Sequence, residues 1–346
     1  MISADKIQEA WPAVRKVVHH TPIFHSHSLA ERCGMDPAHL HLKMENFQRT
    51  GSFKIRGACH RLGTFSEEEK RTGVVAASAG NHAQGIALAA RLAGIHATVF
   101  MPEFASIAKI QATRQYGAEV ILQGSNFDEA VSAAKAFAGE HGGVFVSAFD
   151  DDGIITGQGT LGLEILDDVP DVANVLICVG GGGLFSGVAT ALKAARPHVR
   201  LIGVQAAGAP NAVNSWRAGR LLPHQQVQTI ADGIAIKSPS ERTFEYIQKY
   251  ADAMITVDDQ EITRAILLLL ERAKTVVEPA GGLVALLEAV AELKGNVISV
   301  VHNRISPSVP LGYTGVELLL EVRDAEHIAS LKTGLNANGY RVEMLD

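Results

Sequence analysis

The sequence predicts an α/β protein built on parallel sheets, and three observations lead to this prediction. Short apolar runs, such as residues 74–77, 97–101 and 174–179, lack the alternation of strands with one solvated face, so they indicate strands buried on both faces. Helical segments separate these runs, as in chains of strand–helix–strand units. A length of 346 residues exceeds what one hydrophobic core usually holds, so we expect two domains.

The expected elements follow one another regularly after an irregular start. An amphipathic helix is expected over 4–18, a turn at Thr21-Pro22-Ile23, and an alternating strand over 39–44. The domain boundary is expected near residues 147–153, because Asp150-Asp151-Asp152-Gly153 interrupts the pattern. The remaining strands are expected over 119–122, 144–146, 199–204, 253–257, 316–322 and 340–344, and the helices over 83–93, 105–116, 127–139, 184–195, 259–273, 281–293 and 325–338.

Composition and charge exclude several classes of protein. The formal charge is −6 and no Lys/Arg-rich run occurs, which argues against a nucleic-acid or membrane-surface partner. Cys33, Cys59 and Cys178 are widely separated and odd in number, as expected for reduced thiols rather than for a disulfide framework or a zinc site. No apolar run reaches membrane length and the N-terminus is polar, so a cytoplasmic protein is expected.

Lys54 lies between an aromatic residue and the predicted start of a helix. The positive end of a helix dipole and an apolar pocket both disfavour the ammonium form of a lysine. The neutral amine attacks carbonyl groups and forms Schiff bases, and Phe53 could shield one face of a flat cofactor. The alternative interpretation is a core aromatic residue beside a solvated charge.

Gly180-Gly181-Gly182-Gly183-Leu184 joins a predicted buried strand to a helix. Glycines allow the backbone to approach an anion closely, and the N–H groups at the helix start can bind phosphate oxygens. The spacing does not match G-x-G-x-x-G, and the next strand ends at Gln205 without a carboxylate. We therefore predict a phosphate site rather than a dinucleotide site, with a flexible turn as the alternative.

Three further segments supply candidate site residues. Ser78-Ala79-Gly80-Asn81-His82 joins a strand to a helix, so its N–H groups could hold a carboxylate. His82 is interpreted as a helix-cap or core residue rather than as a base. Glu278 either suits a helix dipole or sets the charge near a bound cofactor, and Gly233 lets the backbone approach a cofactor ring.

A nucleophilic lysine, a phosphate-binding turn and a carboxylate-binding turn in one α/β chain together indicate a pyridoxal 5′-phosphate enzyme. The chain resembles the threonine dehydratases (threonine ammonia-lyases), in the family that includes serine dehydratase and serine racemase. The matching segments lie within residues 5–295 and are Ser52 to Gly57, Ser78 to Gly85, Gly157 to Thr160, Gly180 to Leu184, Thr229 to Ala235 and Glu278 to Gly281. The resemblance implies a tryptophan-synthase β-like fold (fold type II) of two domains. It implies a small domain at 45–148 and a large domain at 1–44 and 149–301.

The resemblance also implies a role for each site residue. Lys54 would carry the cofactor and, once released, would remove the α-proton of the substrate. Phe53 would stack on the cofactor ring, Gly233 would cover its other face, and Asn81 would bind its hydroxyl oxygen. Threonine would yield 2-oxobutanoate and ammonia, and serine would yield pyruvate more slowly. Ala79 stands where the racemases of this family have a serine base, so efficient racemisation is not expected.

The end of the chain departs from the family pattern. The family follows a late core strand with a Ser/Cys-Gly-Gly-Asn turn that meets the pyridine nitrogen, whereas residues 295–301 here run directly into His302-Asn303-Arg304. Residues 302–346 resemble the later part of an ACT regulatory domain. Several tens of family residues are therefore missing, and we expect weak catalysis, with Ser299 or His302 as a candidate substitute for the lost contact.

Metal binding, assembly and two other functions complete the expectations. Gln205 stands where the racemases have a metal-binding acid, and an amide is a poor ligand for a hard cation, so magnesium is not expected. The family favours self-association, so a homodimer or homotetramer with a small amino-acid substrate is expected. The alternatives are another hydroxy-amino-acid dehydratase of the same fold and a catalytically weak, amino-acid-binding regulatory protein.

Overall fold

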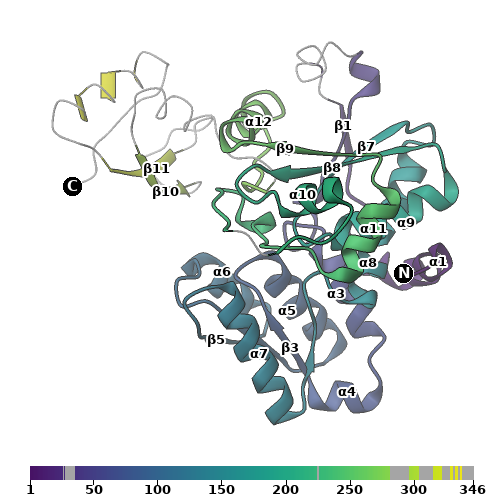
Figure 1. The fold of residues 1–346 in the computed structure, drawn as a ribbon. Coiled ribbons are helices and arrows are strands. Elements are labelled where there is room, and N and C mark those ends of the chain that lie inside the picture. The colour runs from purple at the N-terminus through teal and green to yellow at the C-terminus, as the bar shows by residue number, and fades with distance from the viewer. Residues whose placement is uncertain are drawn as a thin grey trace. The chain divides into compact units, whose positions relative to one another are not determined.

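The computed structural model describes residues 1–25, 27, 36–223, 226–280, 296–303, 315–321, 328–329, 332–333 and 336. The chain forms two compact units, Met1–Asp259 and Gln260–Asp346. The first unit contains two separate parallel sheets, each with its own helices (Figure 1). The prediction of parallel sheets is confirmed, whereas the predicted domain boundaries stay predictions.

The first sheet has the strand order β5-β4-β3-β6, and all of its pairings are parallel. Val74 and Ala76 pack in one hydrophobic cluster with the helix α5, while Val75 and Ala77 pack in another with α7, because successive side chains of a strand point to opposite faces. Both faces are buried, which explains the continuous apolar run. The elements are β3 (Val74–Ala77), β4 (Ala97–Met101), β5 (Glu119–Leu122), β6 (Val144–Phe145), α5 (Asn81–Ala93), α6 (Ile107–Gln115) and α7 (Phe127–His141).

The second sheet has the order β7-β8-β9 and is also parallel. Its core joins Leu201 of the central strand to Phe185 and Leu192 of α9 and to Ile247 of α11. The elements are β7 (Asn174–Cys178), β8 (Arg200–Ala206), β9 (Ala253–Val257), α9 (Gly183–Ala195), α10 (Asn211–Ala218) and α11 (Glu241–Tyr250). The carboxyl end of β7 leads directly into the predicted phosphate-binding turn.

The helix α8 (Asp152–Asp168) packs between α3 (Lys54–Gly63) and α9 through glycines on both of its sides. A Cβ atom at Gly157 would lie 2.5 Å from the carbonyl oxygen of Arg56 on α3. On the other side, a Cβ atom at Gly187 of α9 would lie 2.3 Å from the carbonyl oxygen of Ile155. Real Cβ atoms do not approach so closely, so these glycines allow backbone-to-backbone contact between the three helices.

Two local predictions can be compared directly with the structure. The turn predicted at Thr21-Pro22-Ile23 is not formed: Thr21 and Pro22 precede β1 (Ile23–His25), which begins at Ile23 and pairs antiparallel with β2 (His41–Lys43). Residues 146–151 form no helix or strand, so the regular pattern is interrupted before α8 begins at Asp152, and the domain boundary expected there stays a prediction. Asp151 is the N-cap of that helix, and its Oδ1 accepts a 2.9 Å hydrogen bond from the N–H of Ile154.

The other elements are short helices and the strands of the second unit. In that unit β10 and β11 pair antiparallel. The predicted helix at 281–293, most of the predicted helix at 325–338 and the predicted strand at 340–344 lie outside the described residues, so the ACT-like tail at 302–346 stays a prediction. These elements are α1 (Ala4–Val14), η1 (Pro37–His39), η2 (Glu45–Phe47), α4 (Glu67–Thr72), η3 (Asp232–Ile234), α12 (Asp259–Arg272), β10 (Asn296–Asn303) and β11 (Gly315–Glu321). Within the described part of the chain, no helix combines the length and apolar character needed to cross a membrane.

Candidate active site

Lys54 is the first residue of α3, directly after the N-cap Phe53. Its Nζ donates a 3.3 Å hydrogen bond to the carbonyl oxygen of Ala148 and lies 5.2 Å from the centroid of the Phe53 ring. Burial lowers the pKa of Lys54 from its ordinary value of 10.5 to about 8. At neutral pH the nucleophilic amine is therefore much more populated here than on an exposed lysine.

The turn from Ser78 to His82 leads from β3 into α5, which starts at Asn81. Ser78 and His82 are buried, and the N–H of Gly80 donates a 3.1 Å hydrogen bond to Ser78 Oγ. The first N–H groups of a helix have no partner within the helix, and the helix dipole is positive at this end. The start of α5 is therefore suited to an anion such as a carboxylate.

His82 lies near Lys54 but remains neutral. Burial and, to a lesser extent, the positive charge of Lys54 together lower the pKa of His82 to about 3, although a hydrogen bond to the Val146 carbonyl acts in the opposite direction. The Nε2 atom lies 3.2 Å from that carbonyl oxygen, which requires Nε2 to carry the proton. The Nδ1 atom is then an acceptor, and it has no hydrogen-bond partner among the described residues.

Gly85 explains how the turn from Ser78 to His82 comes close to Lys54. Gly85 lies one turn into α5, and a Cβ atom there would lie 3.2 Å from the carbonyl carbon of Lys54. The helices α5 and α3 therefore pack with their first turns in contact. The amine and the start of α5, which are 27 positions apart in the sequence, share one site.

The turn from Gly180 to Gly183 reaches the same site through Phe149. A Cβ atom at Gly181 would lie 2.3 Å from the Phe149 ring, and Phe149 directly follows Ala148, whose carbonyl accepts the Lys54 hydrogen bond. Gly182 has a φ of +90°, and a Cβ atom there would lie 2.8 Å from Thr243. These glycines are thus needed for close packing and for backbone conformation. The helix α9 begins at Gly183 and continues with the half-buried Leu184, so its first N–H groups are at the site.

The segment η3 lies over the two turns. The Cα atom of Ile234 is 3.0 Å from the position of a Cβ atom on Gly180. Asp232 accepts a 2.6 Å hydrogen bond from Nζ of Lys109 on α6, and that Nζ is 3.6 Å from the position of a Cβ atom on Gly80. Gly233, between Asp232 and Ile234, is exposed. The structure therefore brings Lys54, both turns and η3 together.

The sequence prediction gave no role to three residues of this arrangement, Phe149, Lys109 and Asp232, although Asp232 lies within the matching segment Thr229 to Ala235. Asp232 and Lys109 are 123 positions apart, so their pairing leaves no local pattern in the sequence. Phe149 lies four residues after the end of β6, and the end of a parallel strand is the local signal that could have pointed to it. Glu278 belongs to the second unit, so its predicted role in the site stays a prediction.

The residues present fit pyridoxal 5′-phosphate. The Lys54 amine, with its lowered pKa, suits bonding to the aldehyde group. The start of α9, where three of the glycines admit no side chain, suits the phosphate group. No cluster of three or more His, Cys, Asp or Glu side chains that could hold a metal ion occurs in the described part of the chain. Gln205 is buried, and its Oε1 accepts a hydrogen bond from the N–H of Val213.

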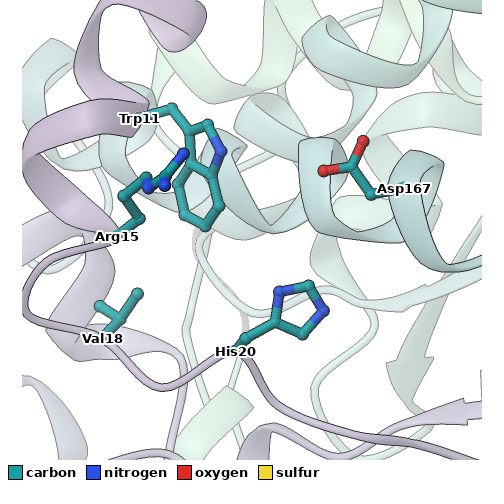
Figure 2. A pocket seen from close by; sticks show the side chains of 5 residues that line it. All are labelled: Trp11, Arg15, Val18, His20 and Asp167. Carbon is teal, nitrogen blue, oxygen red and sulfur yellow. The ribbon is translucent and has the colours of Figure 1, made fainter.

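A separate surface pocket of about 330 Å³ lies near the N-terminus. Figure 2 shows its lining: Trp11 and Arg15 come from the end of α1, Val18 and His20 follow that helix, and Asp167 comes from the last turn of α8. None of these five residues belongs to the segments around Lys54. The pocket is therefore distinct from the candidate active site.

Comparisons with known proteins agree with this site. Residues 14–303 match the model of the family described as pyridoxal-phosphate dependent enzymes. The L-threonine ammonia-lyases of Thermotoga maritima and Geobacter sulfurreducens are 43% and 41% identical, over all of this chain and all of each relative. The alignment with the Thermotoga protein is 403 residues long, so at least 57 aligned positions have no residue in this chain of 346.

Solved structures give the same result. Maize serine racemase has a TM-score of 0.78 at 34% identity, covering 81% of this chain and 84% of the racemase. The processed form of threonine deaminase isoform 2 from Solanum lycopersicum has a TM-score of 0.76 at 37% identity, covering 80% of this chain and 81% of the deaminase. These matches confirm the fold type II prediction, and the chain belongs to the family of pyridoxal-phosphate dependent enzymes.

Proposed function

We propose that this enzyme eliminates ammonia from L-threonine and forms 2-oxobutanoate. The observation that carries the proposal is the position of a Lys54 amine of lowered pKa beside the N-terminus of α5 and the Gly180–Gly183 turn. The similarity to two L-threonine ammonia-lyases along the whole chain supports threonine as the substrate. Serine is a slower substrate in this proposal and yields pyruvate.

The residues around Lys54 have separate roles in this proposed reaction. Pyridoxal phosphate, when bound, withdraws electrons from the α-carbon of the amino acid and makes its proton acidic. Lys54 holds the cofactor and then takes the α-proton as a neutral amine. The first N–H groups of α5 hold the substrate carboxylate, those of α9 hold the phosphate, and Asn81 binds the ring hydroxyl.

The stereochemical outcome follows from Ala79. Racemisation needs a second proton donor on the face of the substrate opposite Lys54, and the methyl group of alanine cannot supply a proton. We therefore propose elimination without efficient racemisation. Serine incubated with the enzyme should release ammonia without matching formation of the D-enantiomer, and equal rates of the two reactions would contradict this proposal.

The aligned positions that this chain lacks support a second part of the proposal, namely weak catalysis. The predicted missing segment carries the turn that meets the pyridine nitrogen in relatives. Without that contact the ring nitrogen is poorly stabilised in its electron-withdrawing form, so turnover is slow while the cofactor still binds at Lys54. A turnover number for threonine equal to that of the Thermotoga relative would overturn this part.

The test follows both the cofactor bond and the product. The protein, saturated with pyridoxal phosphate, is reduced with borohydride and mapped by mass spectrometry, and threonine-dependent ammonia and 2-oxobutanoate are measured in parallel. We expect labelling at Lys54 and slow formation of ammonia and 2-oxobutanoate. The Lys54→Ala variant should lose both the labelling and the product formation. Lys70→Ala, on the surface of α4, is the control that keeps both. Labelling at Lys54 without ammonia from any hydroxy amino acid would favour the regulatory alternative.

Assembly is a separate part of the proposal. We propose a homodimer or a homotetramer, as in the family that the sequence resembles. Light scattering coupled to gel filtration measures the mass directly, and a monomer mass of 36.8 kDa would contradict the proposal.

A further inference from the structure

An ion pair links the two groups of elements that form the candidate active site. Lys109 on α6 and Asp232 on η3 are joined at 2.6 Å, and their side chains are 29% and 58% exposed. The Lys109 side chain runs along Gly80, with Cδ, Cε and Nζ all between 3.6 and 3.9 Å from the position of a Cβ atom there. The ammonium group therefore lies at the edge of the turn assigned to the substrate carboxylate.

This pair brings charge to a turn that otherwise offers only dipoles. His82, the titratable residue of the turn, is neutral at physiological pH. Asp232 adjoins Gly233 and Ile234, and Ile234 contacts the phosphate-binding turn at Gly180. A substrate carboxylate at the start of α5 would thus experience the attraction of Lys109 and the opposing repulsion of Asp232 together.

We propose that Lys109 and Asp232 set the affinity of the site for the carboxylate of its substrate, Lys109 by attraction and Asp232 by opposing it. The inference rests on the proposed carboxylate role of the turn from Ser78 to His82. The pair acts through its net charge, which is zero in this protein, −1 without Lys109 and +1 without Asp232. Both residues are positioning residues, because neither is assigned contact with a reacting atom.

Coulomb's law gives the size of the effect. One unit charge about 7 Å from a carboxylate, in surroundings with an effective dielectric constant between about 40 and 80, changes binding roughly three- to ten-fold. This change in affinity should become smaller as salt is added, because the pair is partly exposed and dissolved ions screen exposed charges.

The experiment is a double-mutant cycle with Lys109→Met, Asp232→Asn and the double variant. Affinity is measured as the KM for threonine and, independently of turnover, as the Kd of L-alanine from the absorbance change of the cofactor-loaded enzyme. We expect both constants to rise three- to ten-fold in Lys109→Met, to fall in Asp232→Asn, and to return near the starting value in the double variant. The change should fall on KM rather than kcat and should shrink at high salt.

Two matched controls separate charge from structure. L-Alaninamide lacks the carboxylate, so its binding should not weaken in Lys109→Met. The Lys193–Asp252 ion pair is 2.8 Å long and lies about 15 Å along α9 from the glycine turn, so Lys193→Met should leave KM and Kd unchanged. Circular dichroism confirms that each variant is folded.

The outcomes distinguish this inference from the proposed function. If both single variants weaken L-alanine binding, the pair is only a structural link and the inference is overturned. If L-alanine and L-alaninamide respond alike to Lys109→Met, the effect does not come from the carboxylate, and the inference is again overturned. Absence of threonine turnover would contradict the proposed function, while the Kd values would still decide the role of the pair.

Discussion

Replacing Glu164 by Gln is expected to lower the free energy of unfolding by about 3 kcal/mol, because the buried Arg56 loses one of its two carboxylate partners. The partly exposed Lys43 also loses a partner but keeps its ion pair with Asp168. Glu164 on α8 is fully buried. One of its carboxylate oxygens accepts a hydrogen bond from Arg56 at 2.7 Å, and the other accepts one from Arg56 at 3.0 Å and pairs with Lys43 at 2.8 Å. Arg56 is also fully buried and has Glu45 as its second partner at 2.8 Å, so the substitution removes half of its charge compensation.

The magnitude follows from desolvation rather than from the attraction alone. Removing one partner of a buried ion pair typically costs about 3–5 kcal/mol, since the remaining charge stays buried. Glutamine keeps an oxygen that can accept one hydrogen bond, so the lower end of this range applies. Glu67 provides the matched control: it pairs with Lys70 at 2.6 Å, but its side chain is 80% exposed, and Glu67→Gln should cost less than about 1 kcal/mol.

Urea denaturation followed by circular dichroism measures both variants, and the pH dependence gives a second check. Burial raises the pKa of Glu164, but hydrogen bonds and charge from Arg56 and Lys43 outweigh burial and hold it below its ordinary value of 4.5. A carboxylate with a lowered pKa contributes stability above its unfolded pKa and loses it as the pH falls through the folded value. Below pH 4.5 the original protein should therefore lose stability more steeply than Glu164→Gln. Equal losses for Glu164→Gln and Glu67→Gln at pH 7 would refute the reasoning.

Three other predictions follow from single residues. Gly157→Ala should lower the free energy of unfolding by at least about 2 kcal/mol, because the added methyl group would meet the α3 backbone. In the control Gly63→Ala on α3, the added methyl group has nothing within 4 Å, so this variant should be neutral or slightly more stable. Thermal denaturation measures both variants. The rate at which Lys54 of the apoenzyme reacts with pyridoxal phosphate should rise with pH and level off above about 8, and a stopped-flow midpoint near 10.5 would contradict the lowered pKa. The imidazole NMR signals of His82 should not shift between pH 5 and 8, whereas a midpoint near 6.5 would show an accessible ring.

The strands and the turns were predictable because their signals are local. Residues 74–77 and 97–101 are continuous apolar runs, and the structure buries both faces of the strands that they form. The helix start at Lys54 follows from the segment around it, since α3 begins at that residue. The identity of the family was equally accessible, because each of its motifs is a short continuous segment.

The helix α8 shows why the rest was not predictable. The segment contains four glycines, which have a low helix propensity, so the sequence does not predict a helix here: Gly153, Gly157, Gly159 and Gly162. Packing against α3 and α9 outweighs that propensity, and it depends on residues about 100 positions earlier and 30 later. The ion pair between Lys109 and Asp232 could not be predicted for the same reason, since neither residue indicates the other in the sequence.

The glycine contacts on both sides of α8 also set the distance between α3 and α9. The helices α3 and α9 each carry one end of the proposed cofactor site at their first residues, Lys54 and Gly183, and each touches the backbone of α8 without an intervening side chain. The distance between the Lys54 amine and the proposed phosphate-binding turn is consequently fixed by the thickness of the α8 backbone, a dimension that no side-chain rotamer can alter. A single methyl group added on either side of α8 would widen that span, so the enzyme should lose its fit to the cofactor before it loses its fold.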